Sequence, residues 1–141
     1  MPKKDETVFV FNKTKQAFLA YRVRIADSIL SRLVGLLGKR SLEADSGLWI
    51  FPSRGIHTFG MMFDIDVIFL DKSLKVVAVR EVVHPFSMTG LHLNAESVLE
   101  LPAHTIFKSR TEVGDEIMIS RFDSLEGVQT KVPAETTGVK G

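Results

Sequence analysis

The apolar residues of this chain gather into seven short runs, and the longest continuous stretch is no longer than a single β-strand. Polar segments rich in Gly, Pro, Asn and Asp separate the runs, and these residues favour turns. Strand-like and helix-like segments do not alternate regularly, which argues against a doubly wound parallel fold. The sequence therefore predicts a mainly β, single-domain protein, either a β-sandwich or an open barrel of jelly-roll-like form, with one or two short helices. We expect strands over residues 8–11, 18–25, 47–51, 64–71, 75–83, 98–101 and 116–120.

The segment 64–71, with the sequence DIDVIFLD, is expected to be a central strand of the sheet. It is apolar on both faces, as strands are when they are covered from both sides. Side chains at positions 64, 66, 68 and 70 share one face because successive residues of a strand point in opposite directions. Asp66 is therefore expected beside Ile68 and Leu70, partly buried, where a carboxylate needs a hydrogen-bonding partner.

Helical spacing is clear in one segment, residues 28–37. Asp27 or Ser28 is a suitable N-cap, and apolar residues then recur at helical intervals: Ile29, Leu30, Leu33, Leu36 and Leu37. A helical turn could also lie within residues 103–114. After Phe122 the composition becomes polar, with too few apolar residues to offset the entropy of ordering. The chain is thus predicted to contain one domain, residues 1–122, and a flexible C-terminal tail, residues 123–141.

Composition excludes several classes of site and partner. The 141 residues include no cysteine, which removes disulfides, thiolate nucleophiles and cysteine-bound zinc. The 18 basic and 17 acidic residues are interspersed, so no basic stripe is present to follow a phosphate backbone. The N-terminal segment does not resemble a secretion signal, and no apolar stretch reaches membrane-spanning length. We expect a soluble, cytoplasmic protein without nucleic-acid or membrane partners and without a cofactor.

Five polar residues of complementary chemistry lie within thirteen positions, before and within the predicted central strand: Arg54, His57, Thr58, Asp64 and Asp66. A histidine oriented by a carboxylate can act as a general base, and an arginine can hold an anion. We take His57 and Asp66 as candidate catalytic residues. The candidate ligand-binding residues are Arg54, Thr58, Met61 and Asp64.

Each of these residues also has a structural interpretation. Asp66 could cap a turn or pair with Arg54, and His57 could bond a loop carbonyl, because structural networks contain the same ionisable groups as active sites. The methionines and phenylalanines at positions 59–63 could line a pocket, although core packing is their more common role. No metal site is predicted, because the other histidines are 8 and 12 positions apart and match no compact ligand spacing: His84, His92 and His104.

Two further polar positions are interpreted as structural. Glu100 stands between Leu99 and Leu101, which point the other way, and it is expected to face solvent or to form a salt bridge. Gly114-Asp115 precedes a predicted strand. It is expected to form a turn in which the glycine supplies a positive φ and Asp115 bonds local backbone amides.

Three functions are consistent with these features. The first is a binding module in which residues 53–64 and the long loop 84–96 form one concave edge for a small polar ligand or a peptide. The alternative is a hydrolase-like enzyme in which His57 and Asp66 act as base and orienter while Arg54 stabilises an anion. The third is an interaction domain for a protein partner. The sequence lacks a phosphate-binding glycine loop, a nucleophile elbow and a dinucleotide fingerprint, which weakens the enzyme hypothesis.

Several short motifs together resemble one known family. They are Arg32-Leu33-Val34-Gly35-Leu36-Leu37-Gly38, Gly47-Leu48-Trp49, Ile56-His57-Thr58-Phe59-Gly60-Met61, Ile65-Asp66-Val67-Ile68-Phe69-Leu70-Asp71, Val98-Leu99-Glu100-Leu101 and Gly114-Asp115. Over about residues 15–120 the chain resembles the family known as domain of unknown function 192. The resemblance implies a compact β-sandwich or jelly-roll-like domain with short helices, and it brings no established activity.

Overall fold

The computed structural model describes residues 7–27 and 40–121, and β-strands dominate them. The strands are β1 (Thr7–Asn12), β2 (Ala17–Ala26), β3 (Ser46–Ile50), β4 (Ile65–Leu70), β5 (Val76–Val83), β6 (Ser97–Pro102) and β7 (Ile117–Arg121). A short helix, α2 (Thr105–Ser109), follows β6 and accounts for the helical turn expected there. All of the predicted strands are confirmed to within one residue at each end. The predicted helix 28–37 and the predicted tail 123–141 lie outside the described residues.

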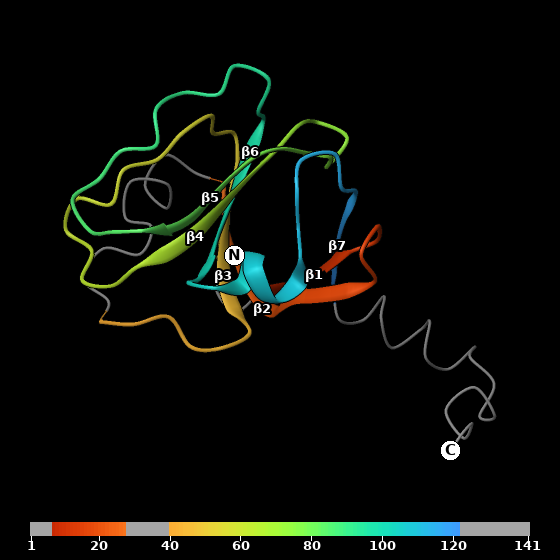
Figure 1. The fold of residues 1–141 in the computed structure, drawn as a ribbon, viewed down its shortest axis with the longest axis horizontal. Coiled ribbons are helices and arrows are strands. Elements are labelled where there is room, and N and C mark those ends of the chain that lie inside the picture. The colour runs from red at the N-terminus through yellow and green to blue at the C-terminus, as the bar shows by residue number, and fades with distance from the viewer. Residues whose placement is uncertain (1–6, 28–39, 122–141) are drawn as a thin grey trace, which may run out of the picture.

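The seven strands of the described residues form one sheet in the order β5-β4-β6-β3-β2-β1-β7, which curls into a half-barrel (Figure 1). The observed sheet corresponds to the open-barrel form of the prediction. β2 and β3 are parallel, whereas the other neighbouring strands are antiparallel. The segments before the two edge strands meet at one end of the sheet, where Lys75 pairs with Glu116 and the Ile117 amide donates to the Leu74 carbonyl at 2.9 Å. These contacts partly close the half-barrel.

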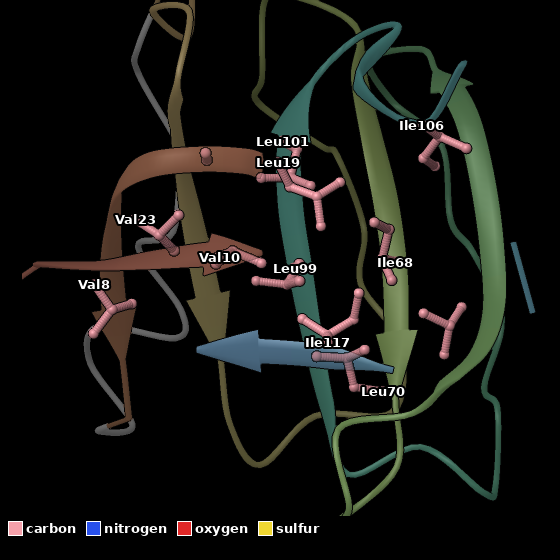
Figure 2. Close-up of a cluster of buried hydrophobic side chains, with 12 residues drawn as sticks. Val8, Val10, Leu19, Val23, Ile68, Leu70, Leu99, Leu101, Ile106 and Ile117 are labelled. Atoms are coloured by element: carbon pink, nitrogen blue, oxygen red, sulfur yellow. The ribbon is translucent and has the colours of Figure 1, made fainter. Parts of the chain in front are cut away.

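The sheet has a hydrophobic cluster on each face. Figure 2 shows the first cluster, to which β1, β2, β4, β5, β6, β7 and α2 contribute side chains. The second cluster contains side chains of β2, β3, β4, β5 and β6 together with Met61 and Ala95, which come from two long loops. Within β4, Ile68 and Leu70 belong to the first cluster, whereas Val67 and Phe69 belong to the second. Because all six residues of β4 are buried, the prediction of a central strand covered from both sides is confirmed.

The predicted turn at Gly114-Asp115 is also confirmed. Gly114 has a φ of 99°, in the left-handed region that glycine adopts most readily. The Asp115 carboxylate accepts a hydrogen bond from the Glu112 amide at 3.0 Å and another from the Asn12 side chain at 2.9 Å. The second bond ties this turn to the end of β1.

Gly47 in β3 stands where the sheet leaves no room for a side chain. A Cβ at this position would lie 2.8 Å from the Glu100 carbonyl oxygen and 2.8 Å from Cδ2 of Leu101. Real Cβ atoms do not approach other atoms this closely, so β3 and β6 would have to separate. The glycine of the Gly47-Leu48-Trp49 motif therefore allows two strands to pack closely.

We expect Gly47→Ala to lower the free energy of unfolding by about 2–3 kcal/mol, because overpacking a well-packed core carries a penalty of this size. Urea denaturation followed by circular dichroism measures the change. Gly90→Ala is a suitable control, because its Cβ would meet nothing within 4 Å and only its positive φ of 77° opposes the substitution. Holding an alanine at a positive φ lowers the free energy of unfolding by about 1 kcal/mol. Equal losses in the two variants would show that crowding at Gly47 is unimportant.

Candidate functional site

Two loops that are far apart in the sequence lie against each other and form one layer. We call residues 53–64 and 84–96 the paired loops. Five backbone hydrogen bonds join them, from Ser53 N to Glu96 O at 3.0 Å, His92 N to Arg54 O at 2.8 Å, Thr89 N to Ile56 O at 3.0 Å, Thr58 N to Ser87 O at 2.8 Å and Phe86 N to Thr58 O at 3.0 Å. The prediction that these segments adjoin is therefore confirmed at the level of their backbones.

Two glycines and two threonines determine how closely the paired loops approach. A Cβ at Gly55 would overlap the carbonyl oxygen of Gly90, so the backbones meet directly at this point. The buried hydroxyl of Thr58 donates to the His84 carbonyl at 2.7 Å and accepts from the Ser87 amide at 2.8 Å. The Thr89 hydroxyl oxygen accepts from the Ile56 amide at 3.0 Å. Thr58, a predicted ligand-binding residue, thus holds the two loops together.

The paired loops pack on the second cluster of the sheet. Met61, another predicted ligand-binding residue, is 3% exposed and joins Ala95 in that cluster beside Val67 of β4. Partly buried Ile56 and Phe63 pack against the same cluster. The layer is therefore anchored by apolar side chains beneath it, and its outer side faces solvent.

Asp66 lies on the other face of the sheet from the paired loops. It has no exposed surface, and its neighbours on the same face of β4, Ile68 and Leu70, belong to the first cluster. Its Oδ1 accepts from the Val82 amide at 2.9 Å and its Oδ2 from the Ile106 amide at 2.8 Å. The carboxylate therefore ties β5 and α2 to the central strand.

The structure does not bring His57 and Asp66 together. His57 is exposed on the paired loops, and its Nδ1 accepts a long hydrogen bond, 3.3 Å, from the Phe59 amide. Both oxygens of Asp66 are bound to backbone amides. Within residues 7–27 and 40–121 no hydrogen bond joins the two side chains, so a histidine oriented by this carboxylate is not formed.

The remaining predicted site residues lie at the margin of the paired loops. Asp64 is half-buried, and its Oδ1 lies 2.8 Å from Nδ1 of His84, so this pair joins the end of one loop to the start of the other. Arg54 is exposed. It lines a hollow of about 300 Å³ together with Pro52, Ser53, Ala95 and Glu96. These charged groups surround the layer without entering its core.

Six large apolar side chains project from the paired loops into solvent. They are between 45% and 75% exposed: Phe59, Met62, Phe86, Met88, Leu91 and Leu93. We call these six residues the apolar patch. His57 links parts of it, because it pairs with Met88 in a β-bridge and its ring lies 5.1 Å from that of Phe59. His57 thus connects Met88 and Phe59, and a contiguous exposed apolar surface is a feature of sites that bind a partner.

The sequence does not identify most of the apolar patch, because core packing is the more common role of residues such as Phe59 and Met62. The sequence does contain a feature that indicates exposed apolar residues. Residues 84–96 combine Pro85, Gly90 and Asn94 with four large apolar residues that show no helical or strand periodicity. Apolar residues without periodicity in a long loop have no core face to join, so an exposed cluster was the consistent interpretation.

Glu100 is a buried acid at the centre of the sheet. It is 4% exposed, and its Oε1 has no hydrogen-bonding partner. It pairs directly with Leu48 of β3 and Val67 of β4, so it shares the face on which the paired loops pack. Burial raises the pKa of Glu100 to about 7, and the charge of Arg24 partly opposes this increase. The expectation that Glu100 faces solvent is therefore wrong.

Within residues 7–27 and 40–121, no group of three His, Cys, Asp or Glu side chains could hold a metal ion. In the same residues, no helix combines the length and the apolar character needed to cross a membrane.

Comparison with known sequences identifies the family that this chain matches. The model of the family described as DUF192, uncharacterized ACR, matches residues 10–119. A UPF0127 protein of Thermococcus sibiricus is 34% identical over 113 residues, which are 77% of this chain and 72% of that protein. A UPF0127 protein of Pyrococcus horikoshii is 33% identical over 113 residues, which are 77% of this chain and 96% of that protein.

Solved structures share the fold. A Sinorhizobium meliloti protein, described provisionally as a transcription regulator, matches 81% of this chain and 92% of its own with a TM-score of 0.66 and 19% identity. A protein of unknown function from Novosphingobium aromaticivorans matches 79% of this chain and 82% of its own with a TM-score of 0.65 and 18% identity. At these identities the likeness shows the fold alone.

Proposed function

Because this chain belongs to the DUF192 family of uncharacterised proteins, we propose its function from its own geometry: it is a binding module for an extended peptide segment of a partner protein. The apolar patch is the observation that carries this proposal. Six of the eleven exposed large hydrophobic side chains among the described residues lie on the paired loops. Covering them with the apolar side chains of a partner removes this surface from water, which favours association.

The chemistry of the patch favours a peptide over a small polar ligand. Its six side chains carry no strong hydrogen-bonding group. His57 lies among them, whereas Arg54 and the Asp64–His84 pair lie at the ends of the loops. A peptide can place apolar side chains on Phe86 and Met88 while its polar groups reach Arg54 or the Asp64–His84 pair at the rim. We assign Arg54 and Asp64 this rim role, whereas Thr58 and Met61 support the surface from below.

The paired loops are already joined by backbone hydrogen bonds and anchored on the sheet. A surface that is formed before binding loses little conformational entropy when a partner arrives. Methionine side chains in the patch can adapt to partners of different shape. The module therefore presents a fixed backbone with adjustable side chains.

A selection of displayed random peptides tests the proposal. We expect the wild-type protein to enrich peptides that contain large apolar residues. The double variant Phe86→Ser/Met88→Ser should weaken their binding by about tenfold or more, because central apolar contacts dominate most interfaces. Fluorescence anisotropy with labelled peptides measures the affinities.

The control is Phe107→Ser/Val113→Ser, which removes two apolar side chains outside the paired loops with similar exposure, 76% and 60% against 72% and 66% for Phe86 and Met88. Binding by this variant should equal that of the wild type. Enrichment of no peptide, or equal losses in both double variants, would contradict the proposal. Sedimentation with lipid vesicles that depends on Phe86 and Met88, without peptide binding, would reassign the patch to a membrane surface.

A further inference from the structure

A second cavity lies outside the paired loops, where two neighbouring strands differ in length. β2 has ten residues and β3 has five, and their pairing begins at Arg22 and Ser46. The first half of β2 therefore has no β3 neighbour. A cavity of about 200 Å³ occupies this place, bordered by residues 17–19, 44–45, 102–103, 105 and 108–109. We call it the α2 cavity, because α2 forms one of its walls.

Two opposite charges line the α2 cavity without neutralising each other. Asp45 comes from the segment before β3 and Lys108 from α2. Within the described ranges, neither side chain forms an ion pair or a hydrogen bond, although the backbone carbonyl of Asp45 accepts from two amides of β2. Both residues are exposed and line the cavity, so a ligand there can reach a carboxylate and an ammonium group.

The other polar side chains of the cavity wall have partners. The Thr105 hydroxyl donates to the Pro102 carbonyl at 2.7 Å, and the Ser109 hydroxyl donates to the Thr105 carbonyl at 2.8 Å. Recognition of a polar ligand would therefore depend mainly on the two charges. The rest of the wall is mostly small and apolar, with alanines at positions 17, 44 and 103 that leave the space open.

An aromatic side chain supplies an apolar surface at the cavity. Phe18 lines it and stacks on Tyr21, with ring centroids 4.7 Å apart and an interplanar angle of 27°. Both side chains are 39% exposed, so part of this aromatic surface remains free. A ligand with an apolar portion can pack against Phe18 while its charged groups reach Asp45 and Lys108.

We propose that the α2 cavity binds a free amino acid or a zwitterion of similar size, with its ammonium group on Asp45, its carboxylate on Lys108 and its apolar portion on Phe18. The charges disfavour other ligand classes. A phosphate group would meet one cation and the repulsion of Asp45, and a metal ion would meet one carboxylate and the repulsion of Lys108. The volume is below the 300–1,000 Å³ that is usual for larger ligands, which fits a molecule of this size.

Titration of the full-length, isotope-labelled protein with each common L-amino acid, followed by amide NMR, tests this proposal. We expect at least one amino acid with an apolar side chain to give saturable shifts at residues 17–19 and 44–45. Its N-acetyl derivative and its methyl ester should each bind about tenfold more weakly or worse, because each lacks one charge that the cavity recognises.

Two substitutions test the two charges separately. Asp45→Asn keeps the size of the side chain, and asparagine tolerates the positive φ of 65° at this position. Lys108→Gln removes the cation from α2. Each should weaken binding by about tenfold, whereas Lys72→Gln, an exposed lysine in the turn before β5, should leave it unchanged. The amide spectrum reports folding of each variant in the same experiment.

Three results would overturn the proposal: no amino acid gives saturable shifts, the blocked derivatives bind as tightly as the free amino acid, or both charge variants bind like the wild type. The proposal does not depend on the peptide-binding function. Either site can fail its test while the other passes.

Discussion

Replacing Asp66 with alanine is expected to lower the free energy of unfolding by about 3–5 kcal/mol, since it leaves two backbone amides without acceptors and each buried loss costs about 1–3 kcal/mol. The amides are those of Val82 and Ile106, and the carboxylate that serves them has no exposed surface. The substitution also leaves a small cavity beside Ile68, which adds to the loss. Urea denaturation measures the difference.

Two comparisons make the Asp66 result specific. Asp66→Asn keeps one oxygen acceptor but turns an amide donor toward the other backbone N–H group, so it should lose a large part of the same stability. His57→Ala removes an exposed side chain and should change the free energy of unfolding by less than about 0.5 kcal/mol. If Asp66→Ala stayed within about 1 kcal/mol of wild type, Asp66 would not link β4, β5 and α2 as described.

Glu100→Gln is expected to stabilise the protein at pH 8 by about 3 kcal/mol, with little effect at pH 4.5. The Glu100 carboxyl has a folded-state pKa of about 7, against 4.5 for the ordinary group. Between these values the unfolded chain releases the proton while the folded protein retains it, so wild-type stability falls as the pH rises from 4.5 to 7. Above pH 7 both states are ionised, and the penalty of about 3 kcal/mol stays constant.

Glutamine cannot ionise, so the variant should lose this part of the pH dependence. Urea denaturation at a series of pH values compares the variant with wild type. Glu81→Gln, at an exposed position of β5, serves as the control and should leave the slope unchanged. If the stability of Glu100→Gln depended on pH as steeply as that of the wild type, the pH dependence would come from other groups.

The strands of this protein could be predicted from sequence because their signals are local. Each short apolar run ends at turn residues, and β4 is apolar on both faces, so its burial from both sides also followed from the sequence. Residue parity along β4 correctly placed Asp66 beside Ile68 and Leu70. These relations depend only on the alternation of side chains within one strand.

The site could be predicted only in part because it depends on contacts between distant segments. Parity placed Asp66 on a face of β4, but it could not show that the paired loops cover the opposite face. The burial of Glu100 has the same cause, because the residues that lie beside it, Leu48 and Val67, come from other strands. Residues 53–64 and 84–96 were correctly expected to adjoin. Which of their apolar side chains are exposed depends on which ones pack against the sheet.

Amide hydrogen exchange of the wild-type protein, with and without the most enriched peptide, tests the central claim most directly. We expect slower exchange on peptide binding at solvent-facing amides of the paired loops around His57, Phe59 and residues 86–93, with little change in β7 at the other edge of the sheet. Protection confined to other parts of the sheet, or no protection at saturating peptide, would contradict the claim that the apolar patch is the binding surface of this protein.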